Sequence, residues 1–174
     1  KWADFSLMVA NNKGIPLDRG EILSLLLKEP EIERNVSKVK QFYSRLLKEQ
    51  GSLPCLWSGK NLRSMSKIDI DHMLPFSVWK NNDLWNLMPS DPKINSMKRD
   101  NIPSLELLDQ RKDAIIHYWT LLHDEFGTTF ENEMKLALLG ESYFPSNWKT
   151  KGFNQLKKKC AHLIGPRGLI AWNP

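Results

Sequence analysis

The chain has 174 residues, of which 41% are hydrophobic and 26% charged, and it carries a net charge of +5. This is the size and composition of one soluble globular domain, with at most a small extra lobe. Seven Trp, seven Phe and three Tyr supply enough apolar mass for a core, which excludes a chain that is disordered throughout. No apolar run approaches the roughly 20 residues that a bilayer-spanning helix needs, which excludes a membrane-spanning protein.

The first residues and the cysteines predict where the protein works. The chain starts Lys-Trp-Ala-Asp, which has neither a leading Met nor a basic and then apolar segment. We therefore expect no signal peptide and a fragment of a larger protein. Cys55 and Cys160 are too few and too far apart for a disulfide framework or a zinc ribbon built from cysteines. The expected location is a reducing cytoplasm, without membrane contact.

The positive charge is concentrated at the C-terminal end. Residues 145–174 hold six cationic side chains and no acidic one, which leaves 19 cations and 20 acids in the rest of the chain. A clustered basic patch suits a polyanionic partner such as nucleic acid, and a solvated helix face is the alternative explanation. Lys157, Lys158 and Lys159 are the candidate nucleic-acid contacts, and we expect their ammonium groups to reach solvent.

Residues 1–50 show the apolar periodicity of helices. One predicted helix, around Ile22 and Leu25, ends at Pro30. A second predicted helix spans residues 35–50, where apolar side chains recur at helical spacing.

The pattern changes after these helices. Residues 51–103 are rich in Gly, Pro, Ser, Asn and Asp and contain only short apolar runs. Helical spacing returns after them, with Ser104 as the N-cap of a long helix, and further helices are predicted over residues 130–139 and 153–164. The chain thus predicts an irregular centre wrapped by helices, and such a turn-rich segment on a rigid scaffold is a typical place for function.

Residues 67–72 begin the informative part of this centre. Polar and apolar side chains alternate there, which is the periodicity of a strand. Asp69 and Asp71 share one face of the predicted strand and His72 lies on the other, while Pro75 ends the strand. A bend after His72 would bring Asp71 and His72 to one site.

A second strand and a short helix are predicted next. The extended run at residues 84–88 is stopped by Pro89, and a Ser-Asp pair then caps a helix with another proline just inside it. This helix carries Asn95 and Lys98 three residues apart and therefore on one face. The unit is predicted to be a strand, a loop, a second strand and a helix.

This unit resembles the ββα-metal site of HNH endonucleases. The chain reads DIDHMLPFS over residues 69–77, LWNLMP over residues 84–89 and NSMKRDNIPS over residues 95–104. These segments are similar to the D-H-x-x-P-x-S, N-L and N-x-x-K segments of the family. The similarity is greatest to members with Asn as the last ligand, such as the HNH domain of CRISPR effector nucleases and bacterial restriction-type proteins. The resemblance covers residues 52–104.

The resemblance implies the fold class and the domain organisation. The fold class is α+β, with a small ββα-metal HNH centre embedded in flanking α-helices. We expect a single HNH nuclease domain over residues 1–174. It consists of N-terminal helices in 1–50, the ββα-metal core in 51–104 and C-terminal helices with the basic end in 105–174.

One departure from the family concerns zinc. Many members carry paired CxxC knuckles around this unit, whereas here Trp57 and Ser58 follow Cys55 where a second Cys would stand. We therefore expect no structural zinc. Packing of Trp57, Trp79 and Trp85 against the outer helices is expected to supply the missing stability.

The resemblance and the side-chain chemistry together nominate the site residues. Asp71 and Asn95 are the candidate metal ligands, since carboxylate and carboxamide oxygens suit a hard cation. Mg²⁺ is the expected cofactor and Mn²⁺ the alternative. His72 is the candidate general base for the attacking water. Asn86 is the middle residue of the catalytic motif, with an amide that pins the loop carrying His72.

Two further residues are candidates for supporting roles. Asp69 shares a strand face with Asp71, so its carboxylate can reach the metal or a water or side chain that contacts the metal ligands. The alternative is that Asp69 is simply solvated. Lys98 lies one turn beyond Asn95 and is a candidate phosphate contact, with a solvated lysine as the alternative.

The expected function is metal-dependent hydrolysis of DNA phosphodiester bonds, with double-stranded DNA as the partner. The resemblance implies a bacterial restriction or anti-phage protein whose sensing domain or partner protein lies outside this chain. One alternative is a nucleic-acid-binding module that keeps the fold without cutting. Another is a nuclease that acts mainly on RNA.

Overall fold

The structure is a computed structural model, and it describes Asp18, Gly20, Leu23 and residues 35–174. The chain divides into two units, Lys1–Ile32 and Glu33–Pro174, and all the elements named below belong to the second. The helix predicted around Ile22 lies outside the described residues. In the described part of the chain, no helix combines the length and the apolar character needed to cross a bilayer.

Helices account for most of the second unit. They are α3 (Ser37–Gln50), α4 (Pro92–Lys98), α5 (Leu105–Phe126), α6 (Thr128–Met134) and α7 (Trp148–Ile164). Shorter helical turns are η1 (Met65–Lys67), η2 (Leu84–Asn86) and the π-helical η3 (Lys135–Leu139).

The strands of the described residues form three separate pairs. They are β1 (Leu53–Pro54) with β2 (Asn61–Leu62), β3 (Asp69–His72) with β4 (Leu87–Ser90), and β5 (Ile102–Pro103) with β6 (Ala171–Trp172). The first two pairs are antiparallel and the third is parallel. This mixture of helices and small sheets confirms the α+β class.

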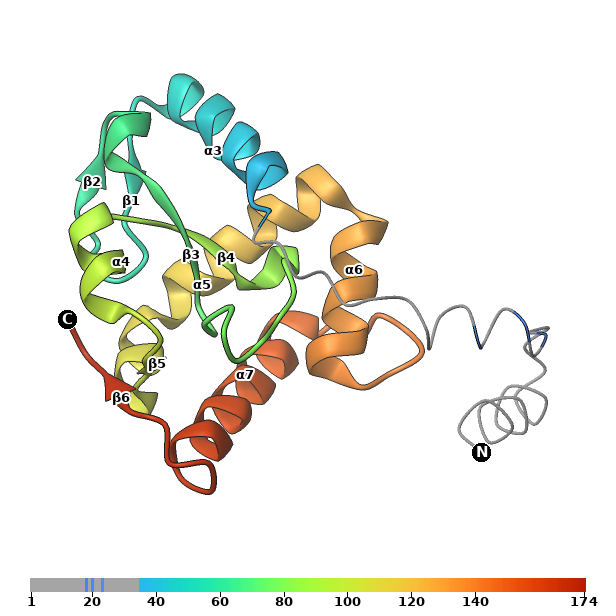
Figure 1. The fold of residues 1–174 in the computed structure, drawn as a ribbon. Helices are drawn as coiled ribbons and strands as arrows, with labels where there is room; N and C mark the ends of the chain where they lie inside the picture. Colours follow the sequence, from blue (N-terminus) through green and yellow to red (C-terminus); the bar gives the residue numbers. More distant parts are fainter. Residues whose placement is uncertain (1–17, 19, 21–22, 24–34) are drawn as a thin grey trace. The chain divides into compact units, whose positions relative to one another are not determined.

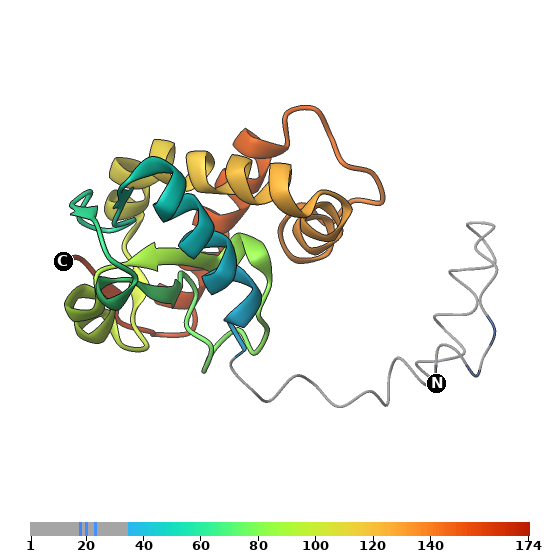
Figure 2. The same ribbon diagram turned by 90° about the horizontal axis from the view of Figure 1, so that it is seen from above.

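The β3–β4 pair and α4 form the predicted strand–strand–helix unit. In the register, Asp71 lies opposite Met88 and His72 lies opposite Leu87. In Figures 1 and 2 this pair lies between α5 on one side and α4 on the other. Helix α4 starts directly after β4, because the Asp91 side chain caps it by accepting a hydrogen bond from the Lys93 N–H at 2.9 Å.

The second strand differs from its prediction in two ways. Residues 84–86 form a 3₁₀ turn rather than extended chain, and the strand continues through Pro89 instead of stopping before it. Pro89 lies opposite Ile70 in the register, and its carbonyl accepts a hydrogen bond from the Leu56 N–H at 2.9 Å. A proline is tolerated here because Leu56 bonds to the carbonyl of Pro89, and a proline has a carbonyl although it lacks the N–H.

The outer helices agree with their predicted positions. Helix α3 covers the predicted 35–50 segment, and Ser104 caps α5 by accepting a hydrogen bond from the Leu107 N–H at 3.0 Å. The segment predicted as one helix over residues 130–139 is α6 followed by η3, which ends at Gly140 in the left-handed conformation, with φ of 66°.

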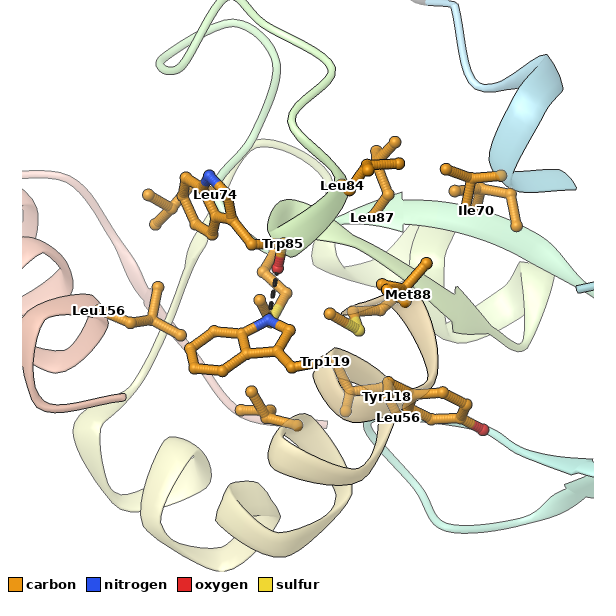
Figure 3. Packing of buried hydrophobic residues seen from close by; sticks show 14 of the residues in the cluster. Leu56, Ile70, Leu74, Leu84, Trp85, Leu87, Met88, Tyr118, Trp119 and Leu156 are labelled. Atoms are coloured by element: carbon orange, nitrogen blue, oxygen red, sulfur yellow. Dashed lines mark hydrogen bonds between the residues drawn. The ribbon is translucent and has the colours of Figure 1, made fainter. Parts of the chain in front are cut away.

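The apolar core joins the long helices to the central unit. Figure 3 shows Trp119 of α5 beneath Trp85 of η2, with the indole N–H of Trp119 donating to the Trp85 carbonyl at 2.7 Å. Helix α7 approaches closely at Gly152, where an added Cβ would lie 3.1 Å from the Met134 sulfur and 3.3 Å from the Trp119 ring. Helix α5 is thus bonded to η2 and is itself packed closely against α7.

Candidate active site

A pocket of about 240 Å³ lies beside the end of β3. Asp71 and His72 line it from the strand, and Asn95, Ser96 and Arg99 line it from α4 and the residue after it. Three of the residues predicted from the sequence therefore meet at one surface. Asp71 and His72 share this pocket although they are neighbours on a strand, where side chains alternate between faces.

Asp71 is 3% exposed, and its carboxylate is held on both oxygens. The indole N–H of Trp57 donates to Oδ2 at 2.6 Å, and the ammonium group of Lys98 lies 3.1 Å from Oδ1. These two contacts fix the orientation of the carboxylate and supply the polar partners that a buried charge needs. A carboxylate oxygen accepts more than one contact, so both oxygens keep capacity for another partner.

His72 is 2% exposed, and its ring is fixed by two neighbours. Its Nε2 lies 3.2 Å from Oδ1 of Asn82, and its ring meets that of Phe76 edge to face at 5.4 Å. An amide oxygen only accepts hydrogen bonds, so a neutral imidazole making this contact would donate from Nε2 and would carry its basic lone pair on Nδ1.

Asn86 is fully buried and is bonded to the loop that follows β3. Its Oδ1 accepts a hydrogen bond from the Leu74 N–H at 2.7 Å, and its Nδ2 donates to the Leu74 carbonyl at 2.9 Å. The backbone carbonyl of Asn86 also accepts from the Met73 N–H at 2.8 Å. The amide thus pins the loop next to His72, as predicted, while a role of Asn86 in catalysis stays a prediction.

Asn95 and Asp69 are hydrogen-bonded to each other. The Asn95 Nδ2 donates to Oδ2 of Asp69 at 3.1 Å, and Asn95 Oδ1 accepts no hydrogen bond from the described part of the chain. Asp69 therefore lies behind Asn95 and orients its amide so that the oxygen is available to a ligand. Asp69 thus contacts a candidate ligand side chain, and its supporting role at the site stays a prediction.

Lys98 is neither at a phosphate site nor solvated, which were the two environments predicted for it. It is fully buried, and its ammonium group donates to Asp71 and, at 2.7 Å, to the His72 carbonyl. The lysine is therefore not a solvated side chain, and its ammonium group has protein partners where we expected a phosphate. Burial raises the pKa of the nearby Cys160 thiol to about 12, and the charge of Lys98 opposes this rise.

The three lysines of the basic end also differ from one another. Lys157 forms a salt bridge with Asp109 at 2.6 Å, and Lys159 lies over the Trp79 ring at 4.5 Å from its centre. Lys158 is exposed, as the sequence predicts for all three. The turns of α7 against α5 explain the difference, because they bring Lys157 to an acidic partner that is distant in sequence.

Three residues of the site were not predicted as functional. Trp57 binds Asp71 and Asn82 binds His72, while Arg99 lines the pocket with its backbone at φ 51° and ψ −131°. Arg99 is the one non-glycine residue with positive φ among those described, and such strain is concentrated at functional sites. A sequence signal existed only for Trp57, which with Ser58 follows Cys55 where related chains have a second cysteine.

The pocket residues fit a hard divalent cation. Asp71 offers carboxylate oxygens, Asn95 offers an amide oxygen that no described residue uses, and both line the same pocket. Among the described residues no cluster of three or more His, Cys, Asp or Glu side chains could hold a metal. A site here would thus have two protein ligands and leave the remaining positions to water and substrate.

The comparison with protein families agrees with this geometry. A strand pair and a helix bring Asp71, His72 and Asn95 to one polar pocket. Residues 55–104 match the sequence model of the HNH endonuclease family. No curated protein matches the chain. This match supports a nuclease that acts on nucleic acid, and HNH nucleases generally use a divalent metal.

Proposed function

We propose that the protein is a metal-dependent endonuclease that hydrolyses phosphodiester bonds of double-stranded DNA. The observation that carries the proposal is the shared pocket of Asp71, His72 and Asn95, in which a base and two oxygen ligands face one space. Mg²⁺ is the proposed ion and Mn²⁺ the alternative. Resemblance to restriction-type nucleases favours a role in bacterial restriction or anti-phage defence, in the cytoplasm, with a sensing domain or partner protein outside this chain.

The residues of the pocket divide the chemistry between them. Asp71 and Asn95 would hold the cation, which when bound would relieve the charge that develops on the phosphate. His72 accepts a proton from water while the water oxygen forms its bond to phosphorus. The bond from phosphorus to the leaving ester oxygen breaks, and that oxygen takes up a proton. Arg99, at the pocket edge, has the planar fork that suits phosphate oxygens.

One contact favours a second candidate function. Lys98 already neutralises Asp71, and an ammonium group in that place would suit a binding module that has lost its metal and no longer cuts. Digestion of supercoiled plasmid with Mg²⁺, with Mn²⁺ and with a chelator separates the two functions. Nicking that needs the metal supports the endonuclease, whereas DNA binding without any nicking supports the module. Digestion of a matched RNA tests the remaining alternative, a nuclease that acts mainly on RNA.

The assignment of the base has its own variant. We expect His72→Ala to lower the cleavage rate about 10²–10⁴-fold, the usual span for a lost general base, while the protein stays folded. His117→Ala is the matched control, because His117 is an exposed histidine on α5. Cleavage at the wild-type rate by folded His72→Ala protein would refute the role of His72.

A further inference from the structure

Lys98 is the least expected feature of the site. A fully buried lysine is rare in proteins unless it is paired. Here the ammonium group is within hydrogen-bonding distance of Asp71 Oδ1 and of the His72 carbonyl, at 3.1 and 2.7 Å. One side chain at the end of α4 is thus tied to two consecutive residues of β3. Its aliphatic stem brings the charge to within 5.8 Å of the Trp57 ring centre.

The direction from which Lys98 reaches Asp71 is informative. Asp71 lines the pocket, whereas Lys98 does not, and the lysine side chain is only 1% exposed. The ammonium group therefore contacts the carboxylate from the protein interior, while a ligand in the pocket would approach from the opening. The two positive charges need not exclude each other sterically. They do repel each other, since both lie close to the same carboxylate.

We propose that Lys98 is a positioning residue that acts as an internal counter-charge for Asp71. Its ammonium group holds the Asp71 carboxylate and the His72 carbonyl in their working positions when no metal is bound. The same charge lowers the affinity of the pocket for a divalent cation. This inference rests on the proposed function, since it takes the pocket to be the metal site.

The substitution Lys98→Met tests both parts, because it keeps the length of the stem and removes the charge. In the presence of a chelator we expect the midpoint of thermal unfolding to fall by about 10 °C, since the substitution removes the counter-charge that Lys98 gives the buried Asp71 carboxylate. Lys93→Met is the matched control, because Lys93 is exposed on the same helix. The double variant Asp71→Asn with Lys98→Met removes both charges and should recover part of the lost midpoint.

The metal-binding part is measured as the rise of the unfolding midpoint on addition of Mg²⁺ or Mn²⁺. We expect this rise to be larger in Lys98→Met than in wild type, equivalent to about tenfold tighter binding or more, because a repelling charge is gone. A purely structural role would not increase it. An equal or smaller rise in Lys98→Met, or an unchanged midpoint in chelator, would overturn the inference.

The two proposals fail in different ways. If wild-type protein shows no rise with either metal and no cleavage, the proposed function is wrong, and the metal-binding part of this inference is wrong with it. If wild-type protein binds metal and cleaves DNA while Lys98→Met binds metal no better, the function stands and this inference alone is refuted. The double-variant comparison in chelator measures the coupling of Lys98 and Asp71 in either case.

Discussion

The amide of Asn86 permits a quantitative test of the loop that carries His72. Asn86→Ala removes the acceptor for the Leu74 N–H and the donor to the Leu74 carbonyl, and both Leu74 and Asn86 are fully buried. Each buried backbone group left without a partner costs about 1–3 kcal/mol. With two groups affected, we expect the free energy of unfolding to fall by about 2–6 kcal/mol.

The assay is urea unfolding of metal-free protein followed by tryptophan fluorescence. The denaturation midpoint should fall while the m-value stays unchanged, because the surface exposed on unfolding is the same. Asn132→Ala is the control, since this asparagine is exposed on α6 and should change stability by less than about 0.5 kcal/mol. A loss of less than about 0.5 kcal/mol in Asn86→Ala as well would refute the reasoning, because the loop would then be held by other contacts.

Alkaline pH and the basic end provide two further predictions. Burial raises the pKa of Cys160 to about 12 and holds those of Tyr43 and Tyr118 above their usual value, so the unfolded chain loses these protons first. The free energy of unfolding should be constant below about pH 9 and should fall above it, by up to about 1.4 kcal/mol per pH unit for each group. Cys160→Ala removes one of these groups, so the fall just above pH 9 should be less steep in that variant. A melting temperature that stays constant from pH 8 to 11 would contradict this. Lys158→Gln should weaken binding to any DNA and reduce the salt dependence of the affinity by about 0.9 in log–log slope. Lys157→Gln should have a smaller effect, because the Lys157 ammonium group already has an aspartate partner. Equal effects of the two substitutions, in anisotropy titrations at several salt concentrations, would contradict this difference.

Local contacts explain why much of the fold could be predicted. The starts of α4 and α5 are set by Asp91 and Ser104, whose side chains cap backbone groups two and three residues further along. The strand periodicity around Asp71 and the order of the motif residues were likewise readable within short segments. These features depend on neighbours in sequence, so the residues themselves were sufficient to predict them.

Contacts between distant residues explain what could not be predicted. A lysine at the end of a short amphipathic helix is usually solvated, and only the packing of α4 against β3 makes Lys98 a buried partner of Asp71. The same holds for Trp57, whose indole reaches Asp71 from the turn between β1 and β2, and for Lys157 of α7, which meets Asp109 of α5.

The sequence by itself therefore determined the resemblance to HNH endonucleases, most of the order of the elements and the candidates Asp71, His72, Asn86 and Asn95. Tertiary structure decided which charges are paired and which face the pocket. The physical reason is that burial and ion pairing depend on the path of the whole chain, because a charged group is solvated or buried according to what other segments bring beside it.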